Sequence, residues 1–189
     1  AETDNIEKAF EQKQLFIADG HHRYETALNF KKKLIEDGVI KDENHPGNYV
    51  MMMLIDMENP GLVVFPTHRL VRGLKNFDLA ATLEKIREYF DVCEIEKTEI
   101  DAALEKNATK KAYVLCAGSD KFYLLVLKDT EKAREALDAL NPGKSDAYKN
   151  LDVTVLHSLI LEKLFGIDKE NMARQINLAY TRDKDEAIR

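Results

Sequence analysis

Two strand-like runs joined by a tight turn constrain the fold of this chain more than any other feature. Residues 112–117 and 121–127 are apolar and rich in β-forming side chains, and Gly118-Ser119-Asp120 between them is typical of a hairpin turn. Further strand-like runs and helical patterns follow one another without strict alternation. This mixture predicts an α+β fold, a mixed sheet with helices packed on it, rather than a doubly wound parallel sheet.

The remaining elements are predicted from residue periodicity and from glycine, proline and capping residues. The further strands are predicted at residues 15–18, 49–57, 62–65, 92–95 and 175–180. The helices are predicted at residues 5–13, 22–37, 78–89, 98–106, 130–140 and 151–165, with a last one from Asp183. The turn at residues 59–61 would join the second and third of these strands into another hairpin. The 189 residues then form a single α+β domain or a fragment of a longer protein, with candidate subdivisions near residues 75 and 145.

Charge and hydropathy argue against several classes of protein. The formal net charge is −6 and the two signs are interspersed, which argues against a broad nucleic-acid surface. The longest apolar run, Tyr49 to Ile55, has the length of a strand and falls well short of the roughly twenty residues that cross a bilayer. Cys93 and Cys116 both lie in apolar runs, where a free cysteine behaves as a small hydrophobic residue. We therefore expect a cytoplasmic protein without a membrane segment, and its oligomeric state stays open.

The densest group of functional side chains is Asp19-Gly20-His21-His22-Arg23, at the junction of a predicted strand and a predicted helix. Glycine permits positive φ and a close backbone approach to a ligand. The first amides of a helix are unpaired and, together with the helix dipole, attract anions. Arg23 adds a planar guanidinium that suits phosphate or carboxylate. The motif therefore predicts an anion- or phosphate-binding turn.

Individual side chains of this turn have candidate catalytic roles. His21 and His22 are hydrogen-bond donors, and either can act as a general base because the ordinary pKa of histidine is about 6.5. Asp19 can accept a proton, orient a histidine or hold a divalent cation such as Mg²⁺. The alternative for the whole motif is an ordinary Asp-Gly turn that caps a helix.

Metal binding is the competing chemistry at this turn. Asp19, one of the two histidines and the distant His68 could supply mixed oxygen and nitrogen ligands for a metal-assisted hydrolase. However, adjacent histidines lack the helical spacing of the common zinc signatures, and no His-Glu-x-x-His sequence occurs.

A second candidate cluster, Pro66-Thr67-His68-Arg69, follows the predicted strand at residues 62–65. If this strand and the strand at 15–18 are neighbours, His68 and Arg69 face the same ligand pocket as the first turn. An ordinary polar turn is the equally weighted alternative. His157, within the apolar helix predicted at 151–165, is interpreted as a core histidine rather than a catalytic one.

Several of these segments together resemble a known family. Residues 16–27, with the Asp-Gly-His-His-Arg-Tyr motif, closely resemble the hallmark of the family called domain of unknown function 1015. Residues 66–71, 151–157 and 180–183 are similar to further blocks of that family. The resemblance implies that this chain is the C-terminal portion of a longer protein whose activity is not established.

The motif is also similar to that of ParB/sulfiredoxin-like nucleotide-binding domains, some of which are free serine kinases. This likeness implies that Gly20, His21, His22 and Arg23 hold nucleotide phosphates, with Asp19 near the transferred group or its magnesium. It makes a nucleotide-dependent small-molecule kinase or nucleotidase the expected function, with ATP or ADP and Mg²⁺ as cofactors. The alternative is a non-catalytic ParB-like ligand-binding module, whose nucleic-acid version the net negative charge disfavours.

Overall fold

The structure is a computed structural model that describes residues 2–118 and 120–189, so Ser119 of the predicted hairpin turn lies outside the described residues. The chain divides into two compact units, unit 1 (Ala1–Val63) and unit 2 (Val64–Arg189). The α+β class predicted from the sequence is confirmed, and the strands form two small antiparallel sheets in place of one mixed sheet.

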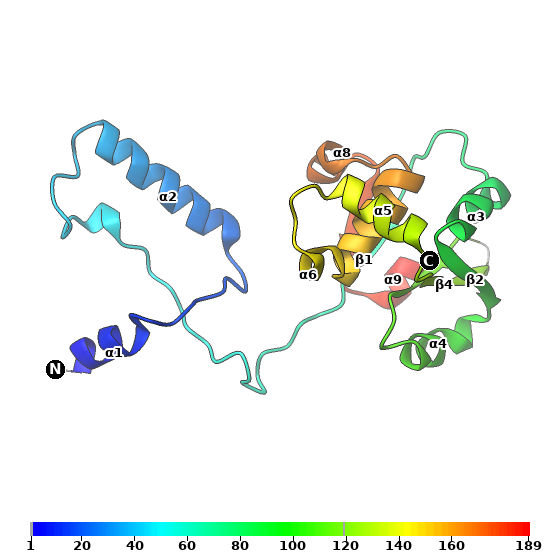
Figure 1. Cartoon of the computed structure of the whole chain (residues 1–189), viewed down its shortest axis with the longest axis horizontal. Coiled ribbons are helices and arrows are strands. Elements are labelled where there is room, and N and C mark those ends of the chain that lie inside the picture. The colour runs from blue at the N-terminus through cyan, green and yellow to red at the C-terminus, as the bar shows by residue number, and fades with distance from the viewer. Residues whose placement is uncertain (1, 119) are drawn as a thin grey trace. The chain divides into compact units, whose positions relative to one another are not determined.

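Unit 1 consists of helices joined by extended segments (Figure 1). Its helical elements are α1 (Glu2–Phe10), α2 (His21–Glu36) and the short 3₁₀ turn η1 (Pro46–Asn48). Helix α2 ends through interactions of neighbouring residues. Gly38 adopts φ +69°, and the Val39 N–H donates to the Leu34 carbonyl at 2.9 Å. No residue of α2 is buried by the described part of the chain.

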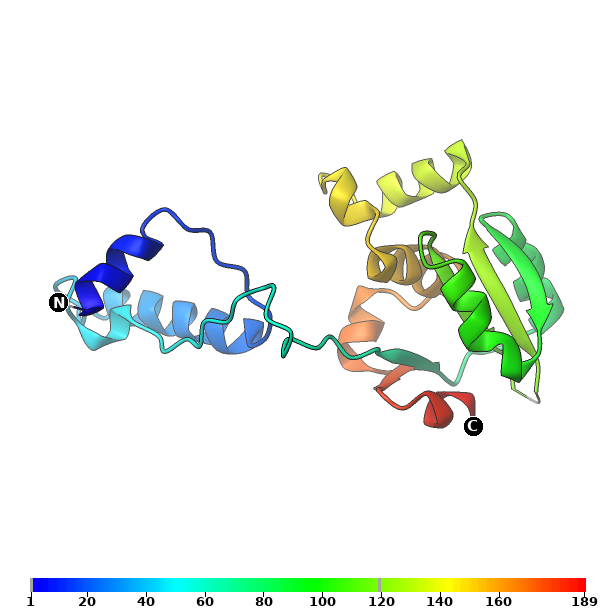
Figure 2. The same ribbon diagram turned by 90° about the horizontal axis from the view of Figure 1, so that it is seen from below.

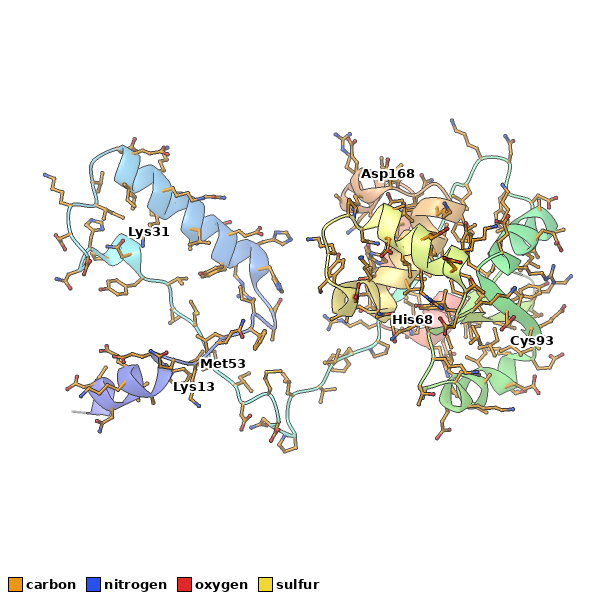
Figure 3. All side chains as sticks on the ribbon, viewed as in Figure 1. Lys13, Lys31, Met53, His68, Cys93 and Asp168 are labelled. Atoms are coloured by element: carbon orange, nitrogen blue, oxygen red, sulfur yellow. The ribbon has the colours of Figure 1, made fainter. Side chains whose placement is uncertain are left out.

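The three strands predicted for unit 1 and its boundary do not form. Residues 15–18, 49–56 and 62–65 run as extended chain without a strand partner among the described residues (Figures 1 and 2). The turn between the last two is present, with the Leu62 N–H bonding the Asn59 carbonyl at 2.9 Å, but its arms do not pair. Met53, which projects from this segment in Figure 3, is 82% exposed. The reason is that an isolated two-stranded ladder is only marginally stable without a packed face.

Unit 2 contains both sheets and the buried core. Its strands are β1 (His68–Val71), β2 (Phe90–Ile95), β3 (Ala112–Cys116), β4 (Phe122–Leu127) and β5 (Leu178–Thr181). Its helices are α3 (Leu79–Arg87), η2 (Lys97–Glu99), α4 (Ile100–Lys106), α5 (Glu131–Leu140), α6 (Asp146–Lys149), α7 (Asp152–Val155), η3 (Leu156–Leu164), α8 (Lys169–Arg174) and α9 (Lys184–Ile188).

The three-stranded sheet has the order β2-β4-β3, and the predicted hairpin is its β3–β4 pair. Its core lies where this sheet meets α3, α5 and η3, with Ile86, Phe90, Leu125 and Leu159 at most 1% exposed. Side-chain caps begin several of these helices, since Asp78 accepts from the Ala81 N–H and Thr130 accepts from the Ala133 N–H.

The second sheet corrects the sequence-based boundaries. No strand forms at residues 62–65, where one was predicted, and strand β1 lies at His68–Val71 instead. It pairs antiparallel with β5, so that Arg69 is opposite Tyr180. The predicted helix at 151–165 is continuous, but its second part, η3, has π-helical geometry, with the Phe165 N–H bonding the Ile160 carbonyl at 3.0 Å. Gly166, at φ +69°, ends it. Strand β1 and helix η3 together place Arg69 next to His157.

Candidate functional site

The Asp-Gly-His-His-Arg turn forms the start of the longest helix of unit 1. Gly20 is the residue before α2 and has φ +85° and ψ +24°, the left-handed conformation that the sequence predicted for a glycine here. The first backbone hydrogen bond of the helix runs from the Tyr24 N–H to the Gly20 carbonyl at 3.0 Å. The left-handed glycine at a helix start is therefore present, and anion binding by this turn stays a prediction.

The amides of this turn are available to a ligand. The N–H groups of His21, His22 and Arg23 precede the first helical hydrogen bond, and no side chain caps them within the part of the chain that the structure describes. Three consecutive donors at the positive end of a helix dipole are arranged to share one anionic group.

Arg23 folds back over the turn. A Cβ atom built at Gly20 would come within 3.0 Å of one terminal nitrogen of Arg23 and within 3.1 Å of its Nε. The same guanidinium lies 3.3 Å from Oδ2 of Asp19, and both side chains are largely exposed. An exposed pair of this kind contributes little to stability, so an incoming anion can compete with Asp19 for the arginine.

The two histidines are at the surface. The His22 side chain is fully exposed, with its Nδ1 3.8 Å from Oε2 of Glu25, and its carbonyl accepts a 2.7 Å bond from the Thr26 hydroxyl. His21 is also exposed. The structure thus brings Asp19, Gly20 and Arg23 together, and leaves both imidazoles accessible on the first turn of α2.

The second predicted cluster belongs to unit 2, where His68 and Arg69 are strand residues and not part of a polar turn. His68 is labelled in Figure 3. Neighbouring side chains of a strand point to opposite faces, so the two do not act as one pair. Arg69 is half-buried: it donates to the Thr67 carbonyl and to Nε2 of His157 at 3.3 Å, and its guanidinium lies 5.8 Å from the Tyr180 ring centre. Its Nε is buried without a hydrogen-bond partner in residues 2–118 and 120–189.

The sequence did not predict the contact that His157 makes with Arg69. As predicted for a core histidine, its imidazole has a partner, but that partner is an arginine from a distant strand. Arginine can only donate, so Nε2 of His157 must accept and the proton must reside on Nδ1. The sequence offered no local signal for this pairing, because β1 and η3 are far apart along the chain.

Acid should destabilise unit 2 through His157. Burial, and then the nearby positive charge of Arg69, lower the pKa of His157 below its ordinary value of about 6.5. The folded state therefore binds this proton more weakly than the unfolded state, so the contribution is fully present above pH about 6.5 and is lost as pH falls through the lowered pKa. We expect the melting temperature to fall more steeply from pH 7.5 to 5 in the wild type than in His157→Gln, whose side chain does not titrate. His22→Gln is the control and should keep the wild-type slope, and equal slopes in all three proteins would contradict the prediction.

The structure adds two observations on metals and membranes. Among the residues that it describes, no three His, Cys, Asp or Glu side chains gather as a metal site would require. Within the same part of the chain, no helix combines the length and the apolar character needed to cross a bilayer.

Comparison with known proteins gives one finding. A family model described as "Protein of unknown function (DUF1015)" matches residues 1–154, which include the turn at the start of α2 and strand β1. Neither a curated protein nor a solved structure matches the chain significantly.

Proposed function

Since this chain belongs to the DUF1015 family of proteins of unknown function, its activity has to be inferred from its own residues, and we propose that the turn Asp19–Arg23 binds the phosphates of a nucleotide. The observation that carries this proposal is the geometry at Gly20. A left-handed glycine, three amides without a side-chain cap and a guanidinium lie together at the start of a sixteen-residue helix.

The roles of the five residues follow from their positions. The amides of His21, His22 and Arg23 donate hydrogen bonds to the phosphate oxygens, and the Arg23 guanidinium neutralises the phosphate charge. When Arg23 turns from Asp19 to the phosphate, the Asp19 carboxylate is released and can hold the Mg²⁺ of an ATP or ADP complex. The exposed imidazoles of His21 and His22 are then beside the phosphate as proton donors or acceptors.

Phosphoryl transfer is the reaction class that this arrangement suits. Such reactions need mainly positioning of the phosphate and stabilisation of its charge, which amides, an arginine and magnesium provide. The similarity of the motif to ParB/sulfiredoxin-like nucleotide-binding turns supports the same choice. We therefore propose a nucleotide-dependent small-molecule kinase or nucleotidase.

The test is binding of ATP and ADP, with and without Mg²⁺, measured by isothermal titration calorimetry on the whole chain. Arg23→Gln should weaken binding roughly tenfold or more, because a hydrogen bond to a charged group is lost. Lys32→Gln is the matched control, since Lys32 is an exposed cation on the same helix beyond its first turns.

The outcomes separate binding from catalysis. No nucleotide binding, or equal weakening in the Arg23 and Lys32 variants, contradicts the phosphate site. Release or transfer of phosphate is measured by ³¹P NMR with a mixture of small-molecule acceptors. If the nucleotide binds but no phosphate is released or transferred, the phosphate site is supported and the protein is a ligand-binding module rather than an enzyme.

A further inference from the structure

A cavity of about 410 Å³ opens in unit 2, and all the residues that line it belong to that unit. This volume is within the range of about 300–1,000 Å³ that small-molecule sites occupy. Its walls come from α6, α7, η3, α8 and β5. Asp168, the N-cap of α8, is labelled in Figure 3 and does not itself line the cavity. The side chains that line the cavity include Tyr148, His157, Glu162, Lys169, Met172 and Tyr180.

His157 gives this cavity a fixed polar group. Arg69, behind the wall, donates to Nε2 of His157 at 3.3 Å, which leaves the imidazole neutral with its proton on Nδ1. The imidazole is therefore held as a hydrogen-bond donor through Nδ1. It lies in the π-helical segment η3, a geometry that is frequent at functional sites.

The charges around the cavity favour an anion. Arg69 has no carboxylate partner among the described residues, and its guanidinium keeps its charge although burial lowers its pKa. Lys169 lines the cavity and has no ion-pair partner in the described residues. Against these two positive charges, Glu162 brings one carboxylate to the wall. The apolar surfaces of Tyr148, Met172 and Tyr180 complete a site whose lining is mainly apolar with a few polar groups.

We propose that this cavity binds a small organic anion, a carboxylate or a phosphate ester. The ligand's charged oxygens pair with Lys169 and accept the Nδ1–H of His157, while its apolar part packs against Tyr148 and Tyr180. Arg69 is a positioning residue, because it sets the tautomer of His157 from behind the wall.

The experiment uses the whole chain and three probes that share a ring: benzoate, phenyl phosphate and the neutral benzyl alcohol. In ¹H–¹⁵N NMR titrations, at least one anion should cause saturable shifts at amides of η3 and α8, and benzyl alcohol should not. A preference for benzoate or for phenyl phosphate decides between carboxylate and phosphate as the natural group.

Two lysine variants make the test independent of folding defects. Lys169→Gln should weaken the preferred anion roughly tenfold, because one charge-assisted contact is lost. Lys163→Gln is the matched control: Lys163 is an exposed lysine on η3 that stacks on Tyr89, 5.9 Å from the ring centre, and does not line the cavity. It should leave the affinity unchanged.

The role of Arg69 has its own readout. In Arg69→Gln the NMR-measured pKa of His157 should rise, because the nearby positive charge is removed, and anion binding should become pH-dependent. The proposal is overturned by the absence of saturable shifts with either anion, by equal affinity for benzyl alcohol, or by equal effects of the two lysine variants. These results do not bear on the nucleotide proposal, whose residues all lie in unit 1.

Discussion

Replacing Gly20 by alanine should abolish most of the nucleotide affinity, with an expected loss of at least about thirtyfold. An alanine at φ +85° carries a backbone strain of about 1–2 kcal/mol. Its Cβ would also lie 3.0–3.3 Å from the Arg23 guanidinium, so this group must shift by a few tenths of an ångström from its place over the turn. If the strain is relieved by a change of φ, the amides of His21 and His22 turn away from the phosphate instead. Titration calorimetry with Mg-ATP measures the loss.

Gly38→Ala is the control, because it introduces a similar backbone strain at a position outside the proposed nucleotide site. Gly38 lies just after the other end of α2, has φ +69°, and a Cβ built there meets no atom within 4 Å. Both variants should lower the helicity of α2 by similar amounts in circular dichroism, while only the Gly20 variant loses nucleotide. A comparable loss of affinity in the two would show that α2 stability, and not the turn, controls binding.

The second large effect is expected in the core of unit 2. Phe90→Ala should lower the free energy of unfolding by about 3–5 kcal/mol, a large part of the total for a single domain. Phe90 is fully buried, begins strand β2, and packs edge-to-face on Tyr113 with 6.1 Å between ring centres. Its removal leaves a cavity between the sheet and its helices. Urea unfolding followed by circular dichroism gives the value.

Phe77→Ala is the control of the same residue type in the same unit. Phe77 is 46% exposed in the segment before α3, so its loss should cost about 1 kcal/mol or less. If the two phenylalanine variants were equally stable, the core that the structure assigns to β2, β4 and η3 would be wrong.

Much of the local structure could be predicted from the sequence because its causes are local. Asp78 and Thr130 begin their helices with side chains that accept the amide three residues on. Gly38 and Gly166 end theirs because they reach positive φ without a Cβ clash. The conformation of Gly20 could be predicted for the same reason, and so could the exposure of three amides at the start of α2.

Contacts between distant segments could not be predicted in this way. The run at residues 62–65 looks more strand-like than the charged segment His68–Val71, yet only the latter finds a partner, in β5. The apolar segments 15–18 and 49–56 have strong β propensity and stay unpaired in the described chain, because propensity reflects packing against neighbours that must be present. His157 acquired its significance only when β1 placed Arg69 against it.

The sequence by itself therefore determined the α+β class, the ends of several helices and the backbone of the Asp-Gly-His-His-Arg turn, since each depends on φ preferences and hydrogen bonds within a few residues. Only the tertiary structure decided which strands pair, how the chain divides into units, and which polar groups share the cavity around His157. Those outcomes depend on burial and on partners far along the chain, and neither is encoded in any single segment.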